Sequence, residues 1–91
     1  MWFFKSVPSV TWGEVKDDGA IIDVREPYEF KAFHAPKAKN IPLGNIPSFD
    51  PKGKVYVVCA SGSRSKRAVV YLRKKGIDAI NVKGGMAAYR R

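Results

Sequence analysis

Residues Lys54 to Gly76, KVYVVCASGSRSKRAVVYLRKKG, contain a strand, a turn and a helix in direct succession. Val55 to Val58 is the most β-prone run in the chain and predicts a buried central strand. Small residues then form a turn, and apolar residues at helical spacing predict a helix over about 64–75. Gly76 is typical of the left-handed residue that ends a helix. The only cysteine, Cys59, stands where the strand ends and the turn begins.

Strand and helix patterns also alternate through the rest of the chain. Four further strands are expected, over residues 3–7, 20–24, 39–43 and 77–82. Shorter helical segments are expected over residues 12–16, from Pro27 to about 33, over 44–49 and over 86–91. Tyr28, Phe30 and Phe33 are predicted to form the apolar side of the segment that Pro27 opens. This alternation predicts an α/β fold with a mostly parallel sheet.

Length and composition predict one domain over residues 1–91, because a chain this short supports only one core. Hydrophobic residues make up 45% and charged residues 27%, as expected of a soluble globular domain. A single cysteine and a single histidine provide neither an internal disulfide nor four zinc ligands. Nothing indicates a nucleotide, metal or flavin cofactor. No signal peptide or membrane span is recognisable, so a cytoplasmic location is expected.

The net charge of +9 is confined to one half of the chain. Residues 1–45 carry six basic and six acidic side chains, whereas residues 46–91 carry eleven basic and two acidic ones. Such an excess is often only a solvated face, but it can also attract a small anionic substrate or an acidic protein. No helix-turn-helix, zinc-finger or RNA-stacking motif accompanies it, so nucleic acid is not the expected partner.

The turn after Cys59 has the composition of an anion-binding loop. The carboxyl ends of strands form the ligand-binding edge of an α/β domain. The small residues of the turn, 60–63, let successive backbone N–H groups point into one concavity. The following helix N-terminus and Arg64 add positive potential there. This environment would lower the pKa of Cys59 and make it a nucleophile without a neighbouring base. The competing interpretation is a buried structural cysteine.

The segment VCASGSRS resembles the active-site loop of the rhodanese-like sulfurtransferases, a cysteine followed by four residues and an arginine. IIDVREPYEF, HAPKAKNIPL and AINVKGGMAAY match that family in order and spacing, so the resemblance covers residues 11–89. The family usually has Gly-His-Ile-Pro-Gly-Ala where this chain has FHAPKA at 33–38, and often tryptophan where it has Tyr89. The resemblance implies a central, mostly parallel sheet of about five strands flanked by helices on both faces.

The resemblance also implies a sulfurtransferase of the thiosulfate sulfurtransferase type. Cys59 would take a sulfane sulfur from thiosulfate or a persulfide donor and pass it, as a persulfide, to cyanide, a small thiol or a protein thiol. The implied substrate-binding residues are Ala60, Ser61, Gly62, Ser63, Arg64 and Ser65. Asp23 would support the loop or its helix and Arg25 would form a structural ion pair, with a direct role at the substrate as the alternative.

Two other functions are compatible with the residues. Cysteine phosphatases and arsenate reductases also use a thiolate in a backbone cradle that ends in arginine. Their loop has five residues between the two, however, and a loop of four suits a single sulfur atom better. A sulfur carrier or partner-docking module, fed by a protein persulfide donor, fits the basic half of the chain.

The remaining candidate side chains can be explained mainly by structural roles. His34 is expected to be structural rather than a general base. The hydroxyls of Ser61 and Ser63 could bind the anion, or the residues could be chosen only for their size. The aromatic residues are expected to cover the core or a sheet edge rather than to form a partner surface: Trp2, Phe3, Phe4 and Trp12.

Overall fold

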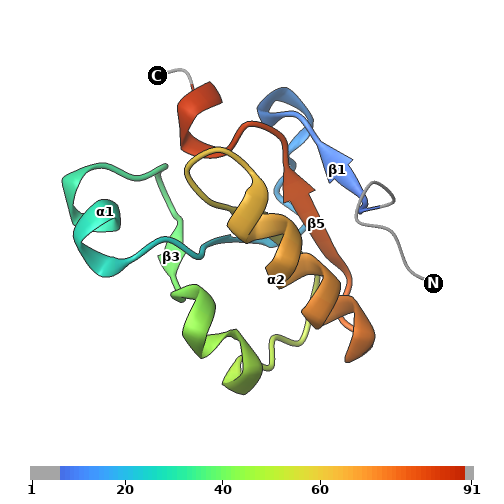
Figure 1. The fold of residues 1–91 in the computed structure, drawn as a ribbon. Helices are drawn as coiled ribbons and strands as arrows, with labels where there is room; N and C mark the ends of the chain where they lie inside the picture. The colour runs from blue at the N-terminus through green and yellow to red at the C-terminus, as the bar shows by residue number, and fades with distance from the viewer. Residues whose placement is uncertain (1–6, 90–91) are drawn as a thin grey trace.

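The computed structural model describes residues 7–89, which form one sheet of five parallel strands (Figure 1). The sheet order is β1-β5-β4-β2-β3, and every neighbouring pair is parallel. The strands are β1 (Ser9–Val10), β2 (Ala20–Asp23), β3 (Lys39–Asn40), β4 (Val55–Val58) and β5 (Ala79–Val82). The predicted α/β fold with about five mostly parallel strands is therefore confirmed.

Helices cover both faces of this sheet. They are η2 (Trp12–Glu14), α1 (Pro27–Ala32), η3 (Leu43–Ser48), α2 (Ser63–Lys74) and η4 (Gly85–Ala88), of which the three η segments are 3-10 helices. Figure 1 shows α2 on the viewer's side of the sheet, beside β5. Among the helices of residues 7–89, none has the length and apolar character that a bilayer crossing requires.

The central strand β4 is buried on both faces, as its apolar run predicts. Val55 and Val57 belong to the larger apolar cluster, which they share with Ala68, Val69 and Leu72 of α2. Tyr56 and Val58 belong to a second cluster that includes Trp12 of η2 and Met86 of η4. Since successive strand residues point to opposite faces, β4 anchors both layers of the fold.

One edge of the sheet is formed by a short strand near the start of the described residues. Within residues 7–89 the first strand is Ser9–Val10, where Ser9 pairs with Asn81 of β5. The predicted strand over residues 3–7 falls almost entirely outside the described residues, as do Trp2, Phe3 and Phe4. The predicted helix over 86–91 is instead the short η4, and its last two expected residues also lie outside the described part.

The prediction that Tyr28, Phe30 and Phe33 form an apolar side of α1 that packs on the core is wrong. Tyr28 is 75% exposed and Phe33 37% exposed, and no residue of the helix is buried. Phe30 stacks on His34, with ring centroids 3.7 Å apart and the planes within 6° of parallel. The helix is only six residues long and is held by polar contacts around its ends, so its aromatic side chains need no place in the core.

One departure from the family pattern affects the backbone. Lys37 has φ = +70°, whereas the family usually has glycine at this position. Left-handed backbone is unfavourable for residues with a Cβ by about 1–2 kcal/mol. The loop before β3 therefore has the backbone conformation that favours glycine, although this chain has lysine there.

Candidate active site

Cys59 lies at the carboxyl end of β4, with a free thiol that is 1% exposed. The turn that follows reaches the start of α2 at Ser63. Gly62 has φ = +121°, which glycine adopts without strain, and its backbone N–H donates to Cys59 Sγ over 3.0 Å. The strand, turn and helix predicted around the cysteine are thus present, and the turn directs backbone donors at the sulfur.

The surroundings of Cys59 have opposing effects on its ionisation. Burial raises the pKa of the Cys59 thiol, whereas the Ser65 hydroxyl and the backbone N–H groups of Ser65, Gly62 and Ser61 lower it. The hydrogen bonds prevail, and the pKa lies below its ordinary value. The thiol donates to Ser65 Oγ over 3.3 Å, and after deprotonation that hydroxyl can donate to the sulfur. The lowered pKa increases the fraction of Cys59 that is thiolate, the nucleophilic form.

Ser65 connects the sulfur to a buried polar chain. Its hydroxyl oxygen lies 2.5 Å from Asn81 Oδ1 and 3.1 Å from Gly62 O, both acceptors for its proton. Asn81 Nδ2 in turn donates to Ser9 Oγ over 3.1 Å, and both Ser65 and Asn81 are fully buried. Asn81 was not predicted from the sequence as a residue of the site. The available signal was an amide within the apolar strand AINV, since a buried amide requires partners.

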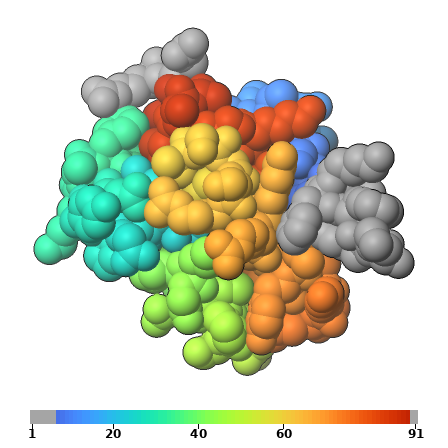
Figure 2. Space-filling view, viewed as in Figure 1, coloured from blue at the N-terminus to red at the C-terminus, as the bar shows by residue number. Residues whose placement is uncertain are grey.

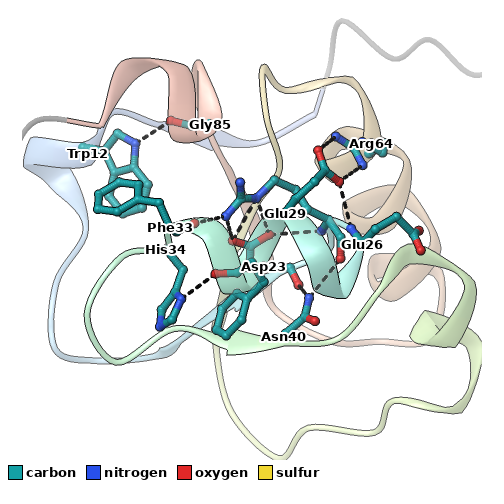
Figure 3. Close-up of polar contacts among 11 residues, drawn as sticks. Trp12, Asp23, Glu26, Glu29, Phe33, His34, Asn40, Arg64 and Gly85 are labelled. Carbon is teal, nitrogen blue, oxygen red and sulfur yellow. Dashed lines mark hydrogen bonds and ion pairs between the residues drawn. The ribbon is translucent and has the colours of Figure 1, made fainter.

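The base of the loop is held by η4. The backbone N–H of Met86 donates to Cys59 O over 2.8 Å, and that of Ala87 donates to Ala60 O over 2.9 Å. A Cβ at Gly85 would lie 2.1 Å from Cys59 O, so only glycine fits there. Figure 3 shows Trp12 fixing this glycine through a 2.8 Å hydrogen bond from Nε1 to Gly85 O.

Arg64 faces α1, where Glu29 holds it. Its Nη1 and Nη2 donate to Glu29 Oε1 and Oε2 over 2.8 and 3.1 Å (Figure 3). This hydrogen bonding lowers the pKa of Glu29 to about 2 and raises the pKa of Arg64. The pair is therefore ionised and neutral overall near pH 7. Arg64 as a substrate-binding residue stays a prediction, and Glu29, 35 residues away in sequence, was not predicted.

Asp23 and Arg25 form a buried ion pair behind the same helix. Arg25 Nη2 lies 2.9 Å from Asp23 Oδ2 and donates to Phe33 O over 2.7 Å, at the end of α1. Asn40 Nδ2 donates to the carbonyl oxygens of both Asp23 and Arg25. The geometry joins β2, α1 and β3, as the structural interpretation requires. A direct role of this pair at the substrate stays a prediction.

His34 lies in the loop that leads from α1 to β3, on the opposite side of the view from Arg64 in Figure 3. Its Nδ1 is 2.7 Å from Phe30 O, and its ring stacks on that residue. Both contacts fit the structural role expected of it, and neither links it to the thiol.

A pocket of about 460 Å³ opens beside the loop, on its β5 side. Its lining residues come from the loop, from α2, and from β1 and β5 with the residues next to these strands: Val7, Ser9, Ser61, Gly62, Lys66, Asn81, Lys83 and Gly84. In Figure 2 the loop segment, in yellow, reaches the surface between the teal α1 region and the red η4 region. Ser61 and Ser63 are exposed, and within residues 7–89 their hydroxyls form no hydrogen bond.

Comparisons of the sequence and of the structure with known proteins find relatives of the same family. Residues 9–91 match the sequence profile of the Rhodanese-like domain family. The solved structure of a rhodanese-like domain protein from Staphylococcus aureus is 40% identical, with a TM-score of 0.80 and coverage of 92% of each chain. The candidate sulfurtransferase YtwF of Bacillus subtilis is 40% identical over 81 residues, which are 84% of this chain and 78% of that protein.

A longer relative contains a similar segment. The tRNA sulfurtransferase of Thermoplasma acidophilum is 37% identical over 68 residues, which are 74% of this chain. This matched segment makes up only 14% of that enzyme's length. The similarity therefore concerns one part of the larger protein.

Proposed function

This chain belongs to the rhodanese-like domain family, and we propose that it transfers a sulfane sulfur through a persulfide formed on Cys59. Relatives named as sulfurtransferases support a role in sulfur transfer. The observation that carries the proposal is the set of donors at the sulfur. Gly62 N–H lies 3.0 Å from Sγ, and with Ser65 it lowers the pKa of the only cysteine.

The proposed reaction has two steps. The Cys59 thiolate attacks the outer sulfur of thiosulfate, a Cys59 S–S bond forms, and sulfite leaves with the electron pair of the broken bond. An acceptor such as cyanide or a thiolate then attacks the outer sulfur of the persulfide and restores the Cys59 thiolate. A covalent intermediate of this kind predicts ping-pong kinetics.

The loop would stabilise the charge at each stage of this reaction. Both the Cys59 thiolate and its persulfide anion carry one negative charge near Sγ, where backbone N–H groups converge. The turn from Cys59 to Arg64 has only four intervening residues, which suits one added sulfur atom better than a tetrahedral phosphoryl group. Loop size thus favours sulfur transfer over phosphate chemistry.

Intact mass measurement tests the proposal directly. After incubation with thiosulfate, the protein should gain about 32 Da, one sulfur atom, and lose it when cyanide is added. Cys59→Ser should gain nothing, whereas Ser48→Ala, on the exposed part of η3, should react like the parent protein. Thiocyanate formation that persists in Cys59→Ser would contradict the proposal.

A second candidate is a sulfur carrier that receives its sulfur from a protein persulfide. The observation that favours it is the charge excess of residues 46–91, which suits an acidic partner. Persulfide formation on Cys59 would then be much faster from a protein donor than from thiosulfate at equal concentration. Comparing the two rates by mass spectrometry separates the candidates.

A further inference from the structure

The pocket on the β5 side of the loop has two lysines that no acidic group neutralises directly. Lys66 comes from α2 and Lys83 follows the end of β5. Within residues 7–89, neither ammonium group forms a salt bridge or a hydrogen bond, and Lys83 only acts at longer range on Glu14. None of the described residues that line the pocket is acidic. These cations therefore give the pocket a positive potential.

The remaining lining connects this pocket to the nucleophile. Gly62 lines the pocket and also donates its N–H to Cys59 Sγ. Asn81 lines it as well and contacts Ser65, the hydroxyl partner of the sulfur. A ligand in the pocket would therefore lie next to the groups that surround the thiolate.

Arg64, by contrast, already has a counter-ion. Its forked bond to Glu29 uses both terminal nitrogens of the guanidinium. Binding a substrate anion there would require the anion to compete with a carboxylate held at close range. Among the described residues, Lys66 and Lys83 beside the loop have no carboxylate at such close range.

We propose that this pocket binds the anionic group of the sulfur donor, with Lys66 and Lys83 selecting sulfonate-bearing compounds such as thiosulfate over neutral ones. The inference rests on the proposed function and deepens it. While the outer sulfur bonds to Cys59, the sulfonate part would remain among the lysines. There it leaves as sulfite, whose negative charge grows as the sulfur–sulfur bond breaks.

The first experiment compares an anionic with a neutral reagent on the same thiolate. For Lys66→Gln combined with Lys83→Gln, kcat/KM with thiosulfate should fall about 10- to 100-fold, chiefly through a higher KM. Methyl methanethiosulfonate, which is uncharged, transfers its methylthio group to Cys59 and releases methanesulfinate. That reaction should keep its rate in the double variant. Equal losses with both reagents would overturn the proposal.

Two further variants serve as matched controls. Lys74→Gln removes the same charge from the other end of α2 and should leave kcat/KM unchanged, because Lys74 is exposed and outside the pocket. Arg64→Gln should lower kcat/KM less than the double lysine variant does. An Arg64 effect larger than that of both lysines together would assign the anion to Arg64 and overturn the inference.

A binding measurement separates this inference from the proposed function. Thiosulfate added to Cys59→Ser should shift the backbone amide NMR signals of Ser61 and Gly62, and the two lysine substitutions should abolish the shift. Lysine-dependent binding to a parent protein that forms no persulfide would refute the proposed function alone. Unchanged binding after removal of both lysines would refute this inference alone.

Discussion

The two sides of the cysteine loop are supported by different kinds of interaction. On the α1 side, ion pairs predominate: Arg64 is matched by Glu29 and Arg25 by Asp23. On the β5 side, the support is neutral. Ser65 and Asn81 share a 2.5 Å hydrogen bond, and η4 donates backbone N–H groups to the base of the loop.

The difference shows how one loop can be both rigid and receptive to an anion. Cations that hold the fold together on the α1 side are neutralised by carboxylates and are poorly available to a ligand. Since the β5 side is held by neutral groups, its cations Lys66 and Lys83 need no structural counter-ion. Positive charge near the loop thus serves structure on one side and, we infer, substrate on the other.

The largest effect on stability is expected from breaking the buried ion pair between Asp23 and Arg25. Asp23→Ala leaves Arg25 buried without its counter-ion, which we expect to lower the free energy of unfolding by about 3–5 kcal/mol. Urea denaturation followed by circular dichroism measures this change. The matched control is Asp50→Asn, which removes an exposed partner of Lys75 and should change stability by less than about 1 kcal/mol. Similar losses in the two variants would mean that the α1 side does not depend on buried charge.

The corresponding change on the β5 side is Gly85→Ala. Its Cβ would lie 2.1 Å from Cys59 O, and its φ is +52°, so we expect a loss of about 2–3 kcal/mol and slower persulfide formation. Gly76→Ala also has positive φ, +89°, but meets nothing within 4 Å. It should cost about 1 kcal/mol and leave the reaction rate unchanged. If Gly85→Ala and Gly76→Ala slowed persulfide formation equally, the close contact between Gly85 and Cys59 O would have no specific role in the reaction.

Ser65→Ala tests whether the neutral side of the loop affects the reactivity of Cys59. Because the Ser65 hydroxyl lowers the pKa of Cys59, its removal should raise that pKa and move the pH–rate curve for alkylation to higher pH. Near neutral pH we expect a rate about 10-fold lower, with the difference vanishing above the new pKa. Alkylation by iodoacetamide, followed by mass spectrometry, provides the curve, and Ser48→Ala is the control. An unshifted curve would assign the activation to the backbone alone.

The smallest effect is expected from Glu29→Gln, and it should depend on pH. The pKa of Glu29 is lowered to about 2 in the folded protein, so its pair with Arg64 stabilises the fold above its ordinary pKa. This stabilisation is lost as the pH falls from about 4.5 toward about 2. Because the pair is partly exposed, it should amount to about 1 kcal/mol or less.

The measurement for Glu29 is the loss of unfolding free energy between about pH 6 and about pH 3. That loss should be smaller in Glu29→Gln than in the parent protein, since other carboxylates titrate alike in both. Ser65→Ala should show the same acid dependence as the parent protein, because the neutral side has no carboxylate to protonate. If all three proteins lost the same unfolding free energy on acidification, the α1 side of the loop would not differ from the β5 side in its dependence on charge.

The parts of the site that could be predicted depend on local signals. The β-prone run before Cys59, the small turn and the helical spacing after it are all contained within about 20 residues. The positive φ of Gly62 and Gly76 follows from turn and helix-end chemistry. Alternating strands and helices then restrict the sheet to a parallel one, which places Cys59 at its ligand-binding edge.

The parts that could not be predicted depend on contacts between distant segments. Nothing near Arg64 in sequence indicates that Glu29 binds it, since that pairing depends on how α1 lies over the loop. The aromatic residues of α1 suggested a buried face, yet Tyr28 is exposed because polar contacts hold the helix. Asn81 could be recognised as unusual in an apolar strand, but its partner Ser65 could not.

Several contacts that complete the site join opposite ends of the chain. Asn81 bonds Ser9 across 72 residues, and Trp12 bonds Gly85 across 73. Such contacts form late in folding, because chain entropy opposes closing long loops before the strands between them are in place. During synthesis Cys59 emerges before β5 and η4, whose contacts with Ser65 and with the carbonyl oxygens of Cys59 and Ala60 hold the pKa-lowering donors of the loop around the sulfur. Reactivity of this thiol is therefore acquired only at the end of folding, so a growing or misfolded chain carries an ordinary, weakly nucleophilic cysteine.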